Sequence, residues 1–205
     1  MRKITAELFI SLDGVVEAPH EWHFPYVDDR MGAAVDAVVG SAGTLLLGRR
    51  TYDSFAGAWP AREAAGGEDA DFARCLGDAR KIVVSRQPLD SGWRNSERLN
   101  GELTEAVTAL KNEPGEDPVV MSGSVSVVRQ LLAAGLLDRL QLLVHPVVLG
   151  KGMRLFEEGG PAVPLELLSS EAFGTGVLNL FYAPAERPGS AGYREAKAHL
   201  PRTGG

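Results

Sequence analysis

The strongest candidate for chemistry is the tripeptide Ser122-Gly123-Ser124, which follows the apolar run 118–121 and precedes a predicted helix over residues 125–134. A glycine between a buried strand and a helix whose first N–H groups are free forms a cradle for an anion. The other interpretation is a tight turn whose glycine only permits the geometry, and this motif alone leaves both open. The later glycines of the G-x-G-x-x-G spacing are missing, which disfavours an ordinary Rossmann domain.

A second candidate is Gly48-Arg49-Arg50-Thr51, which follows the apolar run 44–47, while Ser85 and Arg86 end the next apolar run. Guanidinium groups suit phosphate recognition because they donate paired hydrogen bonds to its oxygens. The carboxyl ends of parallel strands meet at one edge of a sheet, where ligands bind. Each arginine alone could be a solvated surface charge. Three such junctions together favour phosphate binding, and a nucleotide with an extra phosphate would use this positive charge well.

Three aspartates could act as acids. Asp13 follows the first predicted strand and is our candidate catalytic carboxylate, although an Asp-Gly turn is at least as good an explanation. Asp28 and Asp29 are ambiguous between a helix cap and an acid.

Aromatic side chains could wall a substrate site. Trp22, Phe24 and Tyr52 are the candidates, although core packing is the commoner role of such residues. His20-x-x-His23 has the spacing of half a metal site, but no nearby cysteine or acidic pair completes it. We therefore expect no metal.

The elements that must position these residues follow from the hydrophobic pattern. Residues 3–12 alternate as a strand, and a helix is predicted from Asp28 or Asp29 to about Val39. Short buried strands are predicted at 44–47, 80–85 and 118–121, a helix around Leu103, and further strands at 140–149, 165–170 and 176–182. Residues 15–26 read as a loop, and 56–71 as a surface excursion. Strand–helix alternation followed by consecutive strands predicts an α/β sheet, parallel first and antiparallel at its C-terminal edge.

Composition limits the class of protein. The chain has 205 residues and a net charge of −6, which argues against nucleic acid as the main partner. No uncharged apolar run is long enough to span a membrane, no signal-peptide pattern is visible, and the single Cys75 excludes an internal disulfide. We expect a cytoplasmic domain over residues 1–183 and a tail over 184–205. The tail carries an LPxTG pattern, Leu200-Pro201-Arg202-Thr203-Gly204, to which we assign no function.

Several of these stretches together resemble a known family. The sequence resembles the dihydrofolate reductase-like superfamily and is most similar to the C-terminal reductase domain of the bifunctional riboflavin-biosynthesis deaminase-reductase. The matching stretches, in order over about residues 2–183, are Leu8–Gly14, Leu46–Tyr52, Lys81–Arg86, Val119–Ser124, Leu131–Leu140, Pro146–Gly152 and Leu155-Phe156.

The resemblance implies an NADPH-binding fold with a mixed sheet of about eight strands and helices on both faces. By this likeness the cofactor phosphates would contact Gly48, Arg49, Arg50 and Thr51. Ser85 and Arg86 would lie by the adenosine 2′-phosphate, and the pyrophosphate would be held by Gly123, Ser124, Val125 and Ser126. The acceptor would lie between the first strand and the following helix, where Asp13, Trp22, Phe24 and Tyr52 are the candidates.

Two departures from the family pattern stand out. The Gly-Gly of the family's pyrophosphate loop is Ser122-Gly123 here, and no aspartate among Asp28, Asp29 and Asp36 is in clear register with the carboxylate that fixes the pterin in folate reductases. The resemblance therefore implies an NADPH-dependent reductase of a small heterocyclic or carbonyl/imine substrate. The alternative is a non-catalytic nucleotide-binding protein on the same fold. We also expect a homodimer, for which an apolar edge at residues 140–149 could serve.

Overall fold

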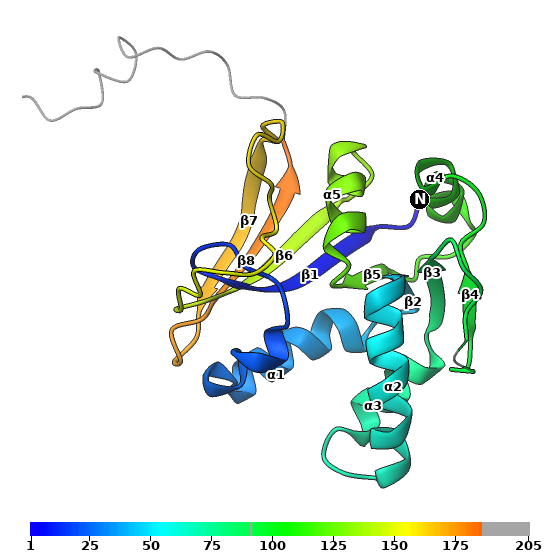
Figure 1. The fold of residues 1–205 in the computed structure, drawn as a ribbon, viewed down its shortest axis with the longest axis horizontal. Helices are drawn as coiled ribbons and strands as arrows, with labels where there is room; N and C mark the ends of the chain where they lie inside the picture. Colours follow the sequence, from blue (N-terminus) through cyan, green and yellow to red (C-terminus); the bar gives the residue numbers. More distant parts are fainter. Residues whose placement is uncertain (91, 186–205) are drawn as a thin grey trace, which may run out of the picture.

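The computed structural model describes residues 1–90 and 92–185, which build one eight-stranded sheet with helices on both faces (Figure 1). The strand order is β4-β3-β2-β5-β1-β6-β8-β7. The strands are β1 (Ile4–Ser11), β2 (Thr44–Gly48), β3 (Arg80–Val84), β4 (Ser96–Arg98), β5 (Val119–Ser122), β6 (Arg139–His145), β7 (Leu165–Ala172) and β8 (Leu178–Pro184). The helices are α1 (Asp29–Val35), α2 (Arg49–Ala65), α3 (Ala70–Asp78), α4 (Leu103–Asn112) and α5 (Val125–Ala133).

The pairing confirms the predicted sheet. Strands β1 to β6 pair in parallel, whereas β8 pairs antiparallel with both β6 and β7. Parallel pairing brings the carboxyl ends of β2, β3, β4 and β5 to one edge. The short strand β4 was not predicted, because three residues carry too little hydrophobic pattern to identify it.

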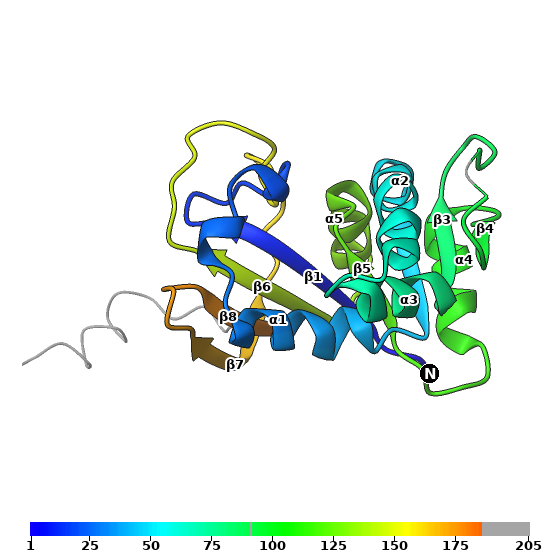
Figure 2. The ribbon, with the colours of Figure 1, turned by 90° about the horizontal axis from the view of Figure 1, so that it is seen from below.

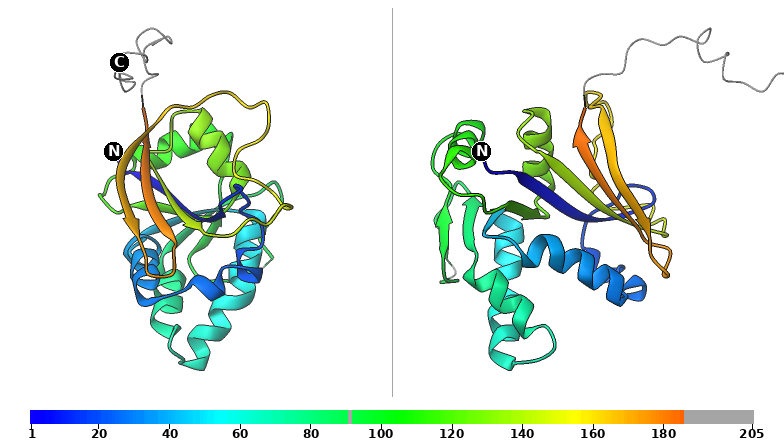
Figure 3. Two further views of the ribbon diagram at one scale, coloured as in Figure 1. Left: turned by 90° about the vertical axis from the view of Figure 1, so that its left-hand side faces the viewer. Right: turned by 180° about the vertical axis from the view of Figure 1, so that it is seen from behind.

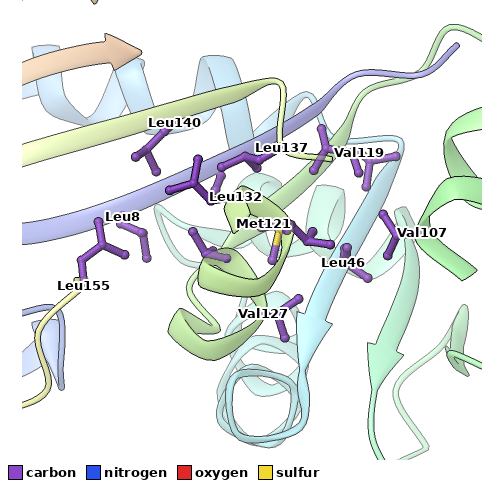
Figure 4. Packing of buried hydrophobic residues seen from close by; sticks show 14 of the residues in the cluster. Leu8, Leu46, Val107, Val119, Met121, Val127, Leu132, Leu137, Leu140 and Leu155 are labelled. Atoms are coloured by element: carbon purple, nitrogen blue, oxygen red, sulfur yellow. The ribbon is translucent and has the colours of Figure 1, made fainter. Parts of the chain in front are cut away.

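Helices α4 and α5 cover one face of the sheet. The even-numbered residues of β1 from Ile4 to Ile10 belong to this layer, together with Met121 of β5 and Leu132 of α5. Figure 4 shows Leu8, Met121 and Leu132 within it. Alternation along β1 thus places its apolar side chains against α5 and sends its odd-numbered residues to the opposite face.

The opposite face is covered by α1, α2, α3 and a π-helical turn, η3 (Asp36–Gly40), that continues α1. Asp28 begins α1 as its N-cap, with its carboxylate accepting the Met31 N–H at 2.8 Å. The turn η3 packs on β1 and β5. The odd-numbered residues of β1 therefore lie under helices rather than in solvent.

Residues 56–71 lie mostly at the surface, as we predicted, but they are largely helical rather than an irregular excursion. Helix α2 runs on to Ala65, α3 begins at Ala70, and Phe55, Trp59 and Phe72 form a row of ring contacts between them. The segment is rich in alanine and glycine and contains Pro60 within α2, so its helical pattern is weak in sequence. Contacts between the two helices, rather than local propensity, account for the helix.

The segments that follow β1 and β6 lie together beyond the ends of these strands (Figure 2). Leu12 N donates to Val147 O at 2.8 Å, and Val16 N donates to Met153 O at 2.9 Å. The loop after β1 contains two short 3₁₀ turns, η1 (Pro19–Glu21) and η2 (Phe24–Tyr26).

Strand β6 is not the apolar edge that we expected to support a dimer, because it pairs with β1 on one side and β8 on the other. The outermost strand at this end is β7, in the β7–β8 hairpin (Figure 3). Pro184 ends β8 and Ala185 N bonds to Pro164 O, whereas the rest of the expected tail, with its LPxTG pattern, lies outside the described residues. Within residues 1–90 and 92–185, no helix is long and apolar enough to cross a membrane.

Candidate active site

The turns that follow β2 and β5 are joined by one side chain. Ser124 Oγ accepts the backbone N–H of Gly48 at 2.5 Å and donates to Thr51 Oγ1 at 2.9 Å. A Cβ on Gly48 would lie 2.8 Å from Ser124 Oγ, so this close approach requires glycine. Ser124 itself has a φ of 66°, a left-handed conformation that is unusual for a residue other than glycine. The structure thus brings together Gly48, Thr51 and Ser124, three of the residues that the resemblance assigned to the cofactor.

Both helices at this junction begin without a side-chain cap. Ser124 stands at the N-cap position of α5, but its hydroxyl bonds to the neighbouring turn instead of to its own helix. Gly48 has no side chain with which to cap α2. The N–H groups of Val125 and Ser126 therefore open α5 at the same edge as the start of α2, and Gly123, with a φ of 90°, turns the chain between strand and helix. Uncapped helix N-termini of this kind attract anions.

The adjacent arginines Arg49 and Arg50 differ in their contacts. Arg49 forms ion pairs with Asp53 and Asp90 at 2.8 Å each, so its charge is already compensated. Arg50 is exposed and has no hydrogen bond or ion pair with any residue that the structure describes. Arg50 is therefore the member of the pair that is available to a ligand.

Two further arginines lie at this edge. Arg86, just beyond β3, is exposed, and next to it the Ser85 hydroxyl closes a local turn by donating to Gln87 O at 2.8 Å. Arg98 ends β4 opposite Val83 of β3 and was missed with its strand. Neither Arg86 nor Arg98 is paired with another side chain within the described ranges. Three residues with uncompensated guanidinium groups thus lie at or just beyond the carboxyl ends of β2, β3 and β4.

The Asp13 carboxylate is fixed by hydrogen bonds to its own turn and to the segment that follows β6. Its carboxylate accepts the Ser11 hydroxyl at 2.7 Å, the Leu149 N–H at 3.1 Å and the Gly150 N–H at 2.9 Å. The Ser11 bond, followed by the two backbone bonds, lowers the pKa of Asp13 to about 2. A carboxylate that is ionised and fully bonded near neutral pH cannot act as a proton donor. The structure therefore supports the turn interpretation of Asp13 and not the catalytic one.

The predicted aromatic residues fall into two separate groups. Trp22 packs edge-on against His145, 5.1 Å between ring centroids, and the largely exposed Phe24 lies against His23 at 4.3 Å. Tyr52 is instead fully buried beside Trp93 in the core under α2. A side chain without accessible surface does not line a substrate site, so Tyr52 is a core residue, whereas Trp22 and Phe24 remain candidates.

Two histidines stand at the centre of the Trp22 group. His23 stacks on Phe9 at 4.6 Å, and His145 Nδ1 bonds to the Leu143 carbonyl at 2.8 Å. Burial, together with the nearby His145, lowers the pKa of His23 to about 4, and burial also lowers the pKa of His145. Both rings are thus neutral at physiological pH, which suits a packing role. No group of three potential metal ligands occurs among the described residues.

A buried carboxyl group that the sequence analysis passed over lies beside the junction. Glu7 occupies the middle of β1, level with Ser122 at the end of β5, and is 1% exposed. Its Oε2 lies 3.1 Å from Ser122 Oγ, while its Oε1 has no hydrogen-bond partner among the described residues. Burial raises the pKa of Glu7 to about 7, against the opposing effect of the Ser122 bond. In the sequence, Glu7 stood out only as a charged residue on the side of an alternating strand opposite the apolar side chains.

The row of buried polar side chains continues from Glu7 across the sheet. Gln141 of β6 is the register partner of Glu7, and its Nε2 donates to Asn179 Oδ1 of β8 at 3.0 Å. Its Oε1, like Glu7 Oε1, lacks a donor in the described part of the chain. Asn179 borders a hollow of about 340 Å³ between α1 and β8, beside the ion pair of Arg30 with Glu171.

Comparison with known proteins agrees with this architecture. The chain matches the family model described as the RibD C-terminal domain over residues 2–179. It is 28% identical over 182 residues to the uncharacterized protein YyaP of Bacillus subtilis (strain 168), covering 88% of this chain and 94% of that protein.

Two solved structures are similar in fold. A protein of Shewanella sp. PV-4 named for riboflavin biosynthesis has a TM-score of 0.64 and 16% identity, covering 90% of this chain and 99% of its own. Dihydrofolate reductase from Enterococcus faecalis, solved in complex with NADP(H), has a TM-score of 0.59 and 16% identity, with 90% and 97% coverage.

Proposed function

Because the chain belongs to the RibD C-terminal domain family, we propose that it is a reductase that transfers a hydride from NADPH to a small heterocyclic or carbonyl/imine substrate. The observation that carries this proposal is the meeting of two uncapped helix N-termini with three uncompensated arginines at one edge of the sheet. Helix N-termini suit a pyrophosphate, and the arginines suit the additional 2′-phosphate that distinguishes NADPH from NADH.

The residues present fit this cofactor. The first turns of α2 and α5 would hold the pyrophosphate, with Ser124 keeping the two turns in register through Gly48. Arg50, Arg86 and Arg98 would form the surface for the 2′-phosphate. When bound, NADPH supplies the hydride, while the protein orients it and excludes competing reactions.

The acceptor would lie beyond the end of β5, on the α1 face of β1. This region combines the loop that carries Trp22 and Phe24 with the buried Glu7 beside the cofactor turn. Flat rings and a single buried acid suit a small unsaturated heterocycle better than a large or charged polymer.

A homodimer, which we continue to propose, would need a surface other than β6. Strand β7 has an unpaired edge within the described residues and carries the exposed side chains Leu167 and Leu168. Unprotected edge strands pair readily with other chains. Light scattering of the wild type and of a Leu168→Lys variant would test this surface. We expect a dimer in the wild type and a weakened dimer in the variant. An unchanged dimer in the variant would exclude Leu168 from the interface.

The experiment that tests the proposed function is calorimetric titration of the purified protein with NADPH and with NADH. We expect binding that favours NADPH, followed by NADPH oxidation when dihydrofolate or pyrimidine-type acceptors are added. No binding of either nucleotide would overturn the cofactor site. Selective binding without turnover of any acceptor would instead support the non-catalytic alternative.

A further inference from the structure

Glu7 and Ser122 form a pair that links two unusual features of this chain. Ser122 stands where the family pattern has glycine, and a glycine could not provide the hydroxyl that lies 3.1 Å from Glu7 Oε2. The two residues are register partners on adjacent parallel strands, so their side chains leave the sheet on the same face. The serine thus has a specific partner.

The surroundings of Glu7 favour the neutral form of its carboxyl group. Ser122 faces it from β5 and Gln141 flanks it on β6, and neither carries a charge. The turn η3, which packs on β1 and β5, contributes one charged residue, Asp36, and that side chain is exposed. On α1, the Arg30 guanidinium is paired with Glu171. No described cation therefore compensates a carboxylate at Glu7, and burial raises its pKa to about 7.

Hydrogen bonding also fits a protonated Glu7. The Glu7 Oε1 and Gln141 Oε1 atoms belong to register partners, and both lack a donor among the described residues although both are buried. A carboxylate and an amide oxygen cannot satisfy each other, because both are acceptors. One proton on the Glu7 carboxyl group would supply the donor that this row lacks.

Ser122 connects this buried acid to the proposed reaction site. Its side chain is partly exposed, whereas Glu7 is enclosed. It ends β5 immediately before Gly123, whose N–H approaches Glu7 O at 3.4 Å, and so lies at the start of the cofactor turn. A hydroxyl group can accept one proton while donating another.

We propose that Glu7 and Ser122 form a proton-delivery pair, in which Ser122 passes a proton from the buried Glu7 carboxyl group to the acceptor. This inference rests on the proposed reductase function. With NADPH bound, the acceptor carbon would gain its hydride, leaving NADP⁺, and the adjacent nitrogen or oxygen would gain a proton from Ser122 Oγ. In the same step the bond that Ser122 Oγ donates to Glu7 Oε2 would reverse, so that Ser122 Oγ takes the carboxyl proton of Glu7. The resulting Glu7 carboxylate would regain its proton from water after product release.

The test compares Glu7→Gln, Ser122→Ala and a matched control, Glu105→Gln, in which an exposed glutamate on α4 is altered. Single-turnover hydride transfer at saturating NADPH and acceptor is followed from pH 5 to pH 9. In the wild type and the control, we expect the rate to fall as the pH rises through neutrality. Glu7→Gln and Ser122→Ala should lower the rate by roughly 10²- to 10⁴-fold at pH 6 and flatten this profile, as expected for loss of a general acid.

A spectroscopic readout tests the acid independently of activity. The infrared C=O stretch of a protonated carboxyl group should titrate near neutral pH in the wild type and in Ser122→Ala, and should be missing from Glu7→Gln. Its absence from the wild type above pH 5.5, or full activity with an unchanged pH profile in either variant, would overturn the proposal. NADPH affinity should be equal in all four proteins. Failure of the wild type to bind NADPH would refute the reductase function instead.

Discussion

The hydroxyl of Ser124 receives the backbone N–H of Gly48 at 2.5 Å, across 76 positions in sequence. This one contact fixes the turn after β2 against the turn after β5, although α2 and α5 lie on opposite faces of the sheet. It also explains two local features together. Ser124 adopts a left-handed conformation that aims its side chain away from its own helix, and position 48 lacks the Cβ that would collide with it.

Replacing Ser124 should therefore lower the stability of the fold. Ser124→Ala leaves the Gly48 N–H without its acceptor and keeps a Cβ in the left-handed region, so we expect the free energy of unfolding to fall by about 1–3 kcal/mol. Urea denaturation measures this change. Ser126→Ala is the matched control, because Ser126 is exposed in the same first turn and should shift stability by no more than about 0.5 kcal/mol. Equal losses of unfolding free energy in the two variants would contradict the role of the Ser124–Gly48 contact in joining the two turns.

The steric side of this contact can be measured by a double-mutant cycle. The backbone of Gly48, with a φ of −76°, accepts alanine without strain, so the cost of Gly48→Ala comes from the contact with Ser124. We expect a loss of about 1–3 kcal/mol in the wild type and at least about 1 kcal/mol less in a Ser124→Gly background. Additive effects would show that the two residues do not share the space.

Asp13 should affect stability in a pH-dependent way. Its pKa is lowered to about 2 in the folded protein from an ordinary value of 3.8, so its ionised form stabilises the fold above pH 3.8. This contribution is lost as the pH falls through about 2. Asp13→Asn should therefore lower the urea midpoint at pH 7 and have progressively less effect between pH 4 and pH 2. A constant difference across this range would mean that the carboxylate charge is not what matters.

Glu7 should show the opposite pH dependence. Its pKa is raised from 4.5 to about 7 in the folded state, so the protonated form is favoured by folding and its stabilising contribution is lost as the pH rises from about 4.5 through 7. Relative to Glu7→Gln, the wild type should lose up to about 3 kcal/mol of unfolding free energy between pH 4.5 and pH 8. Denaturation of both proteins at these two pH values measures the change. A pH-independent difference would show that Glu7 does not titrate in this range.

The case of Glu7 shows what strand alternation can and cannot predict. The period of β1 correctly identified a strand and its apolar face. The same pattern made Glu7 look solvent-facing, because a single strand does not reveal that α1 and η3 cover the other face. The turns that carry Gly48 and Ser124 were predictable because glycine and serine between a strand and a helix are local signals.

Features that depend on distant partners were not predictable. Helix α2 depends on ring contacts with Phe72 in α3, and the strand nature of β4 depends on its pairing with β3. Likewise, nothing local distinguishes Arg49 from Arg50. Their different contacts arise because the segment that bears Asp90 folds back beside α2.

This difference between the two arginines gives the sharpest prediction for the cofactor. Arg50→Ala and Arg86→Ala remove uncompensated charges, so each should weaken NADPH more than NADH by about 1–3 kcal/mol, and the difference should shrink at high salt. Arg49→Ala is the control. Arg49 already bonds to Asp53, Asp90 and Pro88 O, so its loss should reduce the affinity for both nucleotides equally, through the position of α2. Calorimetry at two salt concentrations measures all three variants. If Arg49→Ala alone became less selective for NADPH, the 2′-phosphate would lie against Arg49, and its ion pairs would have to open on binding.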